Sequence, residues 1–179
     1  DHRDLHSFPT RRSSDLDITS MLVYVSDICN GGANFEFSEK VLCKQAAQER
    51  ERSALDKIRP HVDSKTLVSC QSAIGDFENI VHLLGGPEEK KRAAELMPHL
   101  TIVPDCISAR FESLSESGQI RPRSKLIFGT ADMLKCPILT SNEGFIRATA
   151  GQDIHISAYI HEPRALSERK RLNAIVAKK

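Results

Sequence analysis

Short apolar runs alternate along this chain with longer segments in which apolar residues recur every three or four positions. The short runs predict β-strands, and the three- to four-residue spacing predicts helices with one apolar side. Strands are predicted at residues 21–25, 66–70, 100–103, 137–140 and 153–159. Helices are predicted at residues 37–58, 74–84, 88–96, 107–114 and 125–133, and the first of these segments is one helix or two, ended by Pro60. Strands that alternate with helices in this way predict an α/β fold of three layers, with a central, mostly parallel sheet between helices.

Length, charge and cysteine content restrict the function only weakly. A chain of 179 residues is expected to form one main domain. Its formal net charge of +1 neither requires nor excludes a nucleic-acid partner. The five cysteines lack the spacing of a zinc site or a disulfide framework, so a cytoplasmic location is expected. No apolar run approaches the ~20 residues that span a bilayer, so no membrane contact is expected.

The first residues carry a different kind of signal. Residues 1–16, DHRDLHSFPTRRSSDL, resemble the conceptual translation of a short-read sequencing adapter, residue for residue. Because an adapter-derived segment was never selected to fit a core, we expect a leader at residues 1–20 that is not part of the fold. Met21 is then the expected native start, and the alternative is that the adapter interrupts a longer gene. The expected organisation continues with one domain at residues 21–160 and a basic helix or tail at residues 161–179.

The last third of the domain resembles the C-terminal half of a PIN domain. In that family an acid opens an apolar helix that contains a Thr-Ala step, and an Ile-Leu-Thr strand follows. An Asp or Asn stands two residues after the strand's threonine, with an aromatic residue or His shortly beyond. Here the matching residues are Thr130, Ala131, Ile138, Leu139, Thr140, Asn142 and Phe145.

The earlier part of the chain is compatible with the same family. Residues 23–27 resemble the opening strand of a PIN domain, which ends in the first acid, Asp27. Residues 67–77 resemble the second strand and the helix that bears the second acid. That acid is Asp76 by its apolar neighbours, and Glu78 is the rival. The resemblance extends over about residues 21–159 and implies a three-layer α/β/α PIN-like domain.

This resemblance implies metal-assisted hydrolysis of RNA. Mg²⁺ or Mn²⁺ would be the cofactor, since these hard cations prefer oxygen ligands and lower the pKa of a bound water. The implied metal ligands are Asp27, Asp76, Ser124 and Asn142. The implied catalytic residues are Asp27, Asp76 and Asn142. The implied substrate-binding residues, which would contact RNA phosphates, are Arg121, Arg123 and Lys125.

Two positions depart from the pattern, because Ser124 and Asn142 are neutral where the family usually carries acids. The leading interpretation is therefore a PIN-type ribonuclease of the toxin–antitoxin kind, impaired by the loss of acidic ligands. Its expected partners are RNA, an antitoxin-like protein and a second copy of the chain. The alternatives are a catalytically inactive PIN-like module that binds RNA or protein, and an unrelated α/β protein that matches by chance. For each acid, a role as a helix cap or a solvated surface group also stays open.

Overall fold

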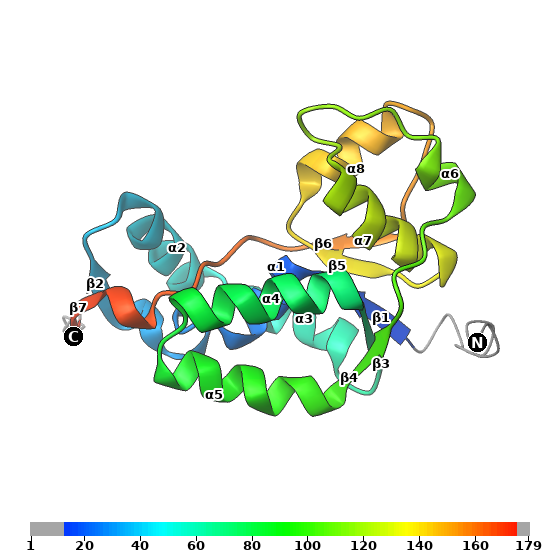
Figure 1. Cartoon of the computed structure of the whole chain (residues 1–179). Helices are drawn as coiled ribbons and strands as arrows, with labels where there is room; N and C mark the ends of the chain where they lie inside the picture. Colours follow the sequence, from blue (N-terminus) through cyan, green and yellow to red (C-terminus); the bar gives the residue numbers. More distant parts are fainter. Residues whose placement is uncertain (1–12, 175–179) are drawn as a thin grey trace.

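A parallel sheet of five strands forms the centre of the molecule (Figure 1). The computed structural model describes residues 13–174. The strand order is β4-β3-β1-β5-β6, and all neighbouring strands in this sheet are parallel. The strands are β1 (Ser13–Leu16), β3 (Thr66–Cys70), β4 (Leu100–Val103), β5 (Ile138–Thr140) and β6 (Ala158–Ile160). All five strands therefore end at one edge of the sheet, the carboxyl edge, where open α/β sheets place their binding groups.

Two groups of helices flank the sheet (Figure 1). The first group is α1 (Ile18–Val25), α2 (Lys40–Glu51), α3 (Ala54–Val62), α4 (Gln71–Leu84) and α5 (Pro87–Leu96). The second group is α6 (Ala109–Glu112), α7 (Pro122–Met133) and α8 (Glu143–Ala150). A separate antiparallel pair joins β2 (Phe35–Phe37) to β7 (Arg171–Ala174). The predicted α/β class with a parallel sheet between helices is confirmed.

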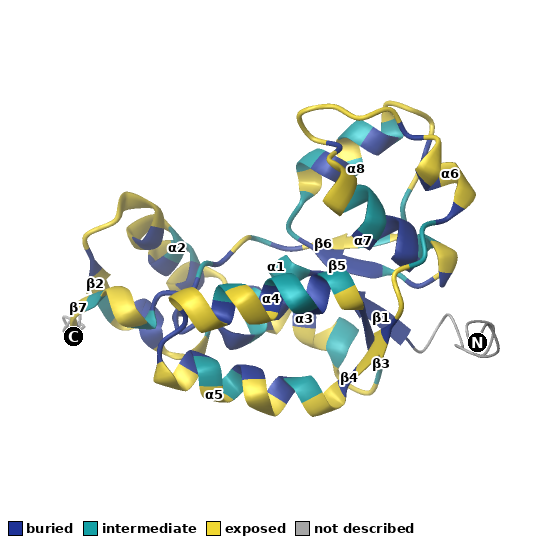
Figure 2. Cartoon of the chain, viewed as in Figure 1, coloured by how far each residue is buried: buried dark blue, intermediate teal, exposed yellow. Residues whose placement is uncertain are grey.

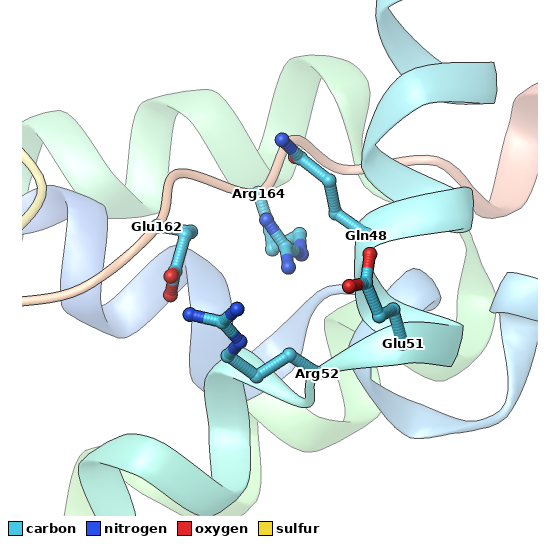
Figure 3. A pocket seen from close by; sticks show the side chains of 5 residues that line it. All are labelled: Gln48, Glu51, Arg52, Glu162 and Arg164. Atoms are coloured by element: carbon cyan, nitrogen blue, oxygen red, sulfur yellow. The ribbon is translucent and has the colours of Figure 1, made fainter.

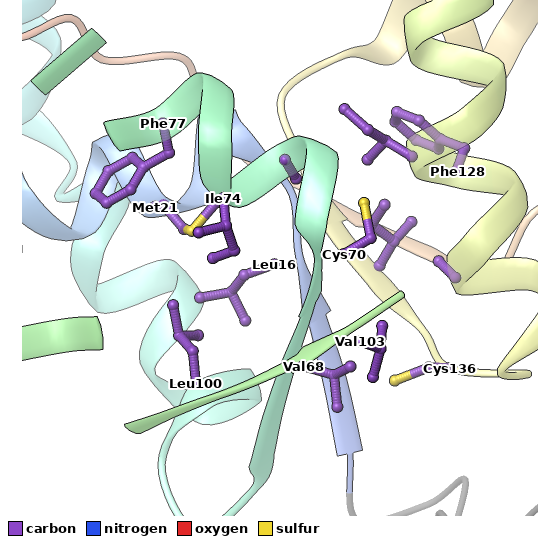
Figure 4. Close-up of a cluster of buried hydrophobic side chains, with 14 of the residues drawn as sticks. Leu16, Met21, Val68, Cys70, Ile74, Phe77, Leu100, Val103, Phe128 and Cys136 are labelled. Atoms are coloured by element: carbon purple, nitrogen blue, oxygen red, sulfur yellow. The ribbon is translucent and has the colours of Figure 1, made fainter. Parts of the chain in front are cut away.

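The main hydrophobic core joins the sheet to both groups of helices (Figure 4). On one face, Leu16 lies among Met21, Ile74 and Phe77 of α1 and α4. Figure 2 shows buried and exposed residues alternating along α4, as expected for a helix with one buried side. Each fully buried side chain of this size contributes about 1.5–3 kcal/mol to folding.

The central strand, β1, lies inside the segment that the sequence assigns to a leader. Ser13, Ser14, Asp15 and Leu16 are all buried, and β1 pairs with β3 on one side and with β5 on the other. The expectation that residues 1–20 stand outside the fold is therefore wrong for residues 13–20. Residues 1–12 lie outside the described residues, and the resemblance of residues 1–16 to an adapter translation stays a prediction.

Asp15 is an acid in the middle of this strand, with 1% of its surface exposed. Burial raises the pKa of Asp15 well above its ordinary value, and the negative charge of Asp17 adds to the rise. Its Oδ2 atom has no hydrogen-bond partner within residues 13–174. Burial therefore favours the neutral form of this carboxyl group, which the core tolerates far better than a buried charge.

The run at residues 21–25 is helical, so the strand predicted there is wrong. These residues belong to α1, which begins after the N-cap Asp17 and buries Met21, Val23 and Val25. A short continuous apolar run is equally compatible with a buried helix and a buried strand. The cap decides between them, because the Asp17 side chain accepts a hydrogen bond from the Ser20 backbone N–H.

The remaining elements follow the predicted pattern with three exceptions. The segment at residues 37–58 forms two helices, as its pattern allowed, but α3 continues through Pro60 instead of ending there. The strand predicted at residues 153–159 begins only at Ala158, because β6 is Ala158–Ile160. The helix predicted near the C-terminus is wrong for residues 164–174, which contain a 3₁₀ turn at Glu168–Lys170 and then β7. This segment is not a separate tail either, because Arg164 and Ser167 are buried against the domain. Within residues 13–174, every helix is too short or too polar to cross a bilayer.

Removing residues 1–20 is expected to prevent folding. The deletion takes away the central strand and the cap of α1, so β3 and β5 lose their common partner. The chain that starts at Met21 should show no cooperative thermal transition by circular dichroism, whereas the full chain should show one. A cooperative transition at an unchanged temperature in the shorter chain would contradict the position of β1.

Candidate functional site

Asp17 is the carboxylate at the centre of the carboxyl edge. It directly follows β1, and only 4% of its surface is exposed. Its Oδ1 atom accepts hydrogen bonds from Thr19 Oγ1 at 2.7 Å and from the Ser20 backbone N–H at 2.9 Å. Its Oδ2 atom accepts one from Thr140 Oγ1 at 2.6 Å, at the end of β5. Because an ionised carboxylate has about four acceptor positions, the protein itself already uses most of them.

Hydroxyl groups extend this network toward β5 and α8. Thr140 Oγ1 accepts a hydrogen bond from the Asn142 backbone N–H at 2.9 Å. The Asn142 side chain caps α8, and its Oδ1 atom accepts from the Phe145 backbone N–H at 3.1 Å. The side-chain oxygen of Asn142 thus has a structural role as a helix cap.

The end of β6 joins the same network through a histidine. Ser20 Oγ lies 2.9 Å from His161 Nε2, and His161 Nδ1 lies 3.0 Å from the carbonyl oxygen of Glu162. Burial lowers the pKa of His161, so its neutral form is favoured. Ser20 Oγ also donates a hydrogen bond to the carbonyl oxygen of Leu139 at 2.5 Å, so this serine links the end of β5 to His161. The serine is 0% exposed, so this pair is closed to a polymer substrate.

A second polar cluster lies near the same edge, beside the ends of β3 and β4. Arg123, in the first turn of α7, donates from Nε to Asp76 Oδ2 at 2.7 Å and from Nη2 to Asp76 Oδ1 at 2.5 Å. It also donates from Nη1 to Ser72 Oγ at 3.0 Å, and Ser72 Oγ donates to Asp105 Oδ2 at 2.7 Å. Burial raises the pKa of Asp105, but hydrogen bonds from Ser72 outweigh it and lower the pKa. Arg123 therefore supplies the positive charge of this cluster.

The residues predicted to bind substrate differ in their availability. Arg121 and Arg123 are exposed at the start of α7, with Ser124 beside them. Lys125 donates from Nζ to the carbonyl oxygens of Glu112 and Leu114, at 3.2 and 2.8 Å, so it holds the preceding loop. Two of the three predicted basic residues are thus presented at the surface.

Asp27 does not lie at the carboxyl edge with the other predicted ligands. It follows the far end of α1, and a helix of eight residues is ~12 Å long. The carboxylate is 1% exposed, and Arg171 binds both of its oxygens, with Nε donating to Oδ2 at 2.7 Å. The physical reason is the helical conformation of residues 21–25, because a strand there would have ended at Asp27. This residue anchors the C-terminal segment to the domain.

The residues at the carboxyl edge do not fit a Mg²⁺ or Mn²⁺ ion. Within residues 13–174, no three His, Cys, Asp or Glu residues are grouped so that they could hold a metal. Asp76 is taken by Arg123, and the oxygens of Asp17 are largely used by hydroxyl and amide donors. Ser124 and Asn142 carry no charge, whereas these cations require several oxygen ligands and usually more than one carboxylate. No chemical step through a metal is therefore derived for this edge.

Sequence reasoning missed Asp17 together with its partners Thr19, Ser20 and His161. The available signal was an aspartate directly before the helical segment, followed by hydroxyl residues, which is a typical helix start. It was overlooked because residues 17–20 were assigned to the leader. The contact of Ser20 with His161 joins residues 141 positions apart and has no local signature.

Two comparisons relate the chain to known proteins. One solved structure, "Crystal structure of VapBC2 from Rickettsia felis bound to a DNA fragment from their promoter", aligns with 84% of this chain and 99% of that chain. The two are 11% identical with a TM-score of 0.45, a similarity too low to support an argument about function. The family model described as "Protein of unknown function (DUF1308)" matches residues 14–175, from the central strand to the end of the small sheet. This chain therefore belongs to the DUF1308 family.

Proposed function

We propose that this protein is a PIN-like module that binds single-stranded RNA through its phosphate backbone without cleaving it. The observation that carries the proposal is the pairing of Arg123 with Asp76. The sequence resemblance expects a metal-bound acid at Asp76, and an arginine occupies both of its oxygens instead. The positive charge available to a phosphate is then that of Arg121, which stands beside this ion pair at the start of α7.

The start of α7 supports phosphate binding independently of any metal. Arg121 is the N-cap of this helix, its side chain makes no cap hydrogen bond, and Pro122 follows. The backbone N–H groups of Arg123 and Ser124 lie in the first turn, where an α-helix provides no acceptor for them. Helix N-termini favour anions for this reason. The two arginines and these amides form one group of donors, which we call the α7 anion surface.

The chemistry of the carboxyl edge supports binding rather than cleavage. A PIN-type nuclease needs several carboxylates around a metal, and Asp17 is the carboxylate that directly follows the central strand. Asp17 is 4% exposed, and hydroxyl groups donate hydrogen bonds to both of its oxygens. These oxygens are therefore poorly accessible for binding a cation that would also contact an RNA phosphate. The choice of RNA over other polyanions rests on the sequence resemblance to PIN domains.

An impaired metal-dependent ribonuclease is the second candidate function. One observation favours it. Asp17 follows the central strand and accepts a hydrogen bond from Thr140 Oγ1, which in turn accepts one from the backbone N–H of Asn142. This is the part of an α/β sheet at which a first acid belongs. The two candidates differ in a measurable way, because the nuclease requires Mn²⁺ or Mg²⁺ and the binding module does not.

The first prediction concerns RNA binding in the presence of EDTA. The full chain should bind a fluorescent single-stranded RNA by anisotropy, and the R121Q/R123Q variant should bind at least about tenfold more weakly. Loss of two phosphate contacts should also lower the salt slope of log K by about 1.4, at ~0.7 per contact for single strands. R59Q is the matched control, because Arg59 is exposed on α3 and pairs with Asp56 at 3.4 Å. Equal affinity of R121Q/R123Q and R59Q would reject the α7 anion surface.

The second prediction separates binding from catalysis with one substitution at Ser124. S124D adds a negative charge to the first turn of α7, so RNA affinity should fall several-fold and no cleavage should appear with Mn²⁺. S124A keeps the backbone N–H and should bind RNA like the unchanged protein. If S124D instead cleaves RNA with Mn²⁺, and D17N abolishes that cleavage, the ribonuclease is the better account.

A further inference from the structure

A polar pocket lies between the end of α2 and the segment that follows β6 (Figure 3). Its volume is about 210 Å³, and its lining is Gln48, Glu51, Arg52, Glu162 and Arg164. None of these residues belongs to the α7 anion surface, and Glu162 contacts the Asp17 network only through its carbonyl oxygen, which lies 3.0 Å from His161 Nδ1. We propose that this pocket binds a small monocarboxylate, with Arg164 and Arg52 as its donors.

Arg164 is a buried guanidinium with one nitrogen left without a partner. Its side chain is 0% exposed. Nε donates to Glu49 Oε2 at 2.8 Å, Nη1 donates to the carbonyl oxygen of Pro163 at 2.9 Å, and Nη2 has no hydrogen-bond partner within residues 13–174. Buried polar groups are almost always paired, and an unpaired charged donor is especially costly. Nη2 can therefore donate a hydrogen bond to a ligand, since no acceptor within residues 13–174 occupies it.

The position of this guanidinium is fixed before any ligand arrives. Glu49 Oε2 also accepts a hydrogen bond from the Ala54 backbone N–H at 2.9 Å, so the carboxylate that holds Arg164 is itself held. Figure 3 shows the guanidinium of Arg164 at the centre of the pocket. A donor fixed in this way loses little conformational entropy when it binds.

Arg52 provides a second donor from the end of α2. Its side chain is exposed, and no ion pair or hydrogen bond of its guanidinium is found in the described part of the chain. Figure 3 shows its guanidinium beneath the carboxylate of Glu162, below the guanidinium of Arg164. A planar guanidinium pairs well with a planar carboxylate, because two parallel N–H groups match its two oxygens.

The charges that line the pocket favour a ligand with one negative charge over a ligand with two. Glu51 and Glu162 also face the pocket, and Lys57 neutralises Glu162 only in part, from 3.2 Å at an exposed position. The C-terminal end of α2, which carries partial negative charge, lies at the same place. A phosphate dianion is disfavoured in these surroundings. The volume also lies below the ~300 Å³ at which drug-sized ligand sites begin, so the ligand is small.

The test is a titration of the ¹⁵N-labelled full chain with sodium acetate at constant ionic strength, with sodium chloride as the reference salt. The Nε–Hε signal of Arg164 should shift saturably with acetate and not with chloride. R52Q should weaken acetate binding at least about tenfold, and R147Q, which changes an exposed arginine on α8, should leave it unchanged. E51Q removes a like charge and should tighten binding about threefold.

Three results would overturn the proposal. The first is a signal of Arg164 that does not saturate with acetate, and the second is an R52Q variant that titrates like R147Q. The third is tighter binding of inorganic phosphate than of acetate, which would reject a monocarboxylate ligand. The α7 anion surface takes no part in these measurements, so they do not depend on RNA binding.

Discussion

The pairing of β1 with strands on both of its sides is the constraint on which the rest of the structure depends. β1 is the central strand, so β3 and β5 can belong to one sheet only through it. The same pairing brings the carbonyl oxygen of Leu16 to Ser69 Oγ, at 2.8 Å, and places Asp17 at the middle of the carboxyl edge. From there Asp17 caps α1 and binds the end of β5. Fold and candidate site thus share one element.

Three acids of this protein are each paired with an arginine. Asp76 is bound by Arg123, Asp27 by Arg171, and Glu49 by Arg164. Pairing of this kind satisfies a carboxylate locally and leaves few oxygens for a metal ion. Glu89 follows the same rule with backbone donors, since its Oε1 atom accepts from the N–H groups of Asp27 and Ser167. The charge arrangement therefore favours a surface that binds an anion over a centre that binds a cation.

Sequence patterns predicted the strands at residues 66–70 and 100–103, because short runs rich in apolar and β-branched residues favour strands. They could not decide residues 21–25, because that run is too short for periodicity to distinguish a helix from a strand. The prediction of a C-terminal helix was wrong for a different reason. Its helical spacing is overridden by long-range contacts, notably Arg171 with Asp27 across 144 positions and the pairing of β7 with β2.

Of the expected site residues, Asp76, Ser124 and Asn142 lie at or near the carboxyl edge, and Ser124 and Asn142 come from the segment with the most specific pattern. Asp17 was missed because its segment was excluded on the basis of its resemblance to an adapter. Asp27 was expected at the end of the first strand as a direct consequence, because residues 21–25 were taken to be that strand. In the structure Asp27 follows the far end of α1, and Asp17 follows the central strand.

The central claim is that the carboxyl edge has no binding site for a divalent cation. Paramagnetic Mn²⁺ tests it most directly, because it broadens the amide signals of nearby residues in the ¹⁵N-labelled full chain. With one equivalent of Mn²⁺, we expect no selective broadening at Asp17, Asp76 and Asn142 compared with the exposed acids of the surface. Selective loss of these three signals would contradict the account and identify the edge as a metal centre.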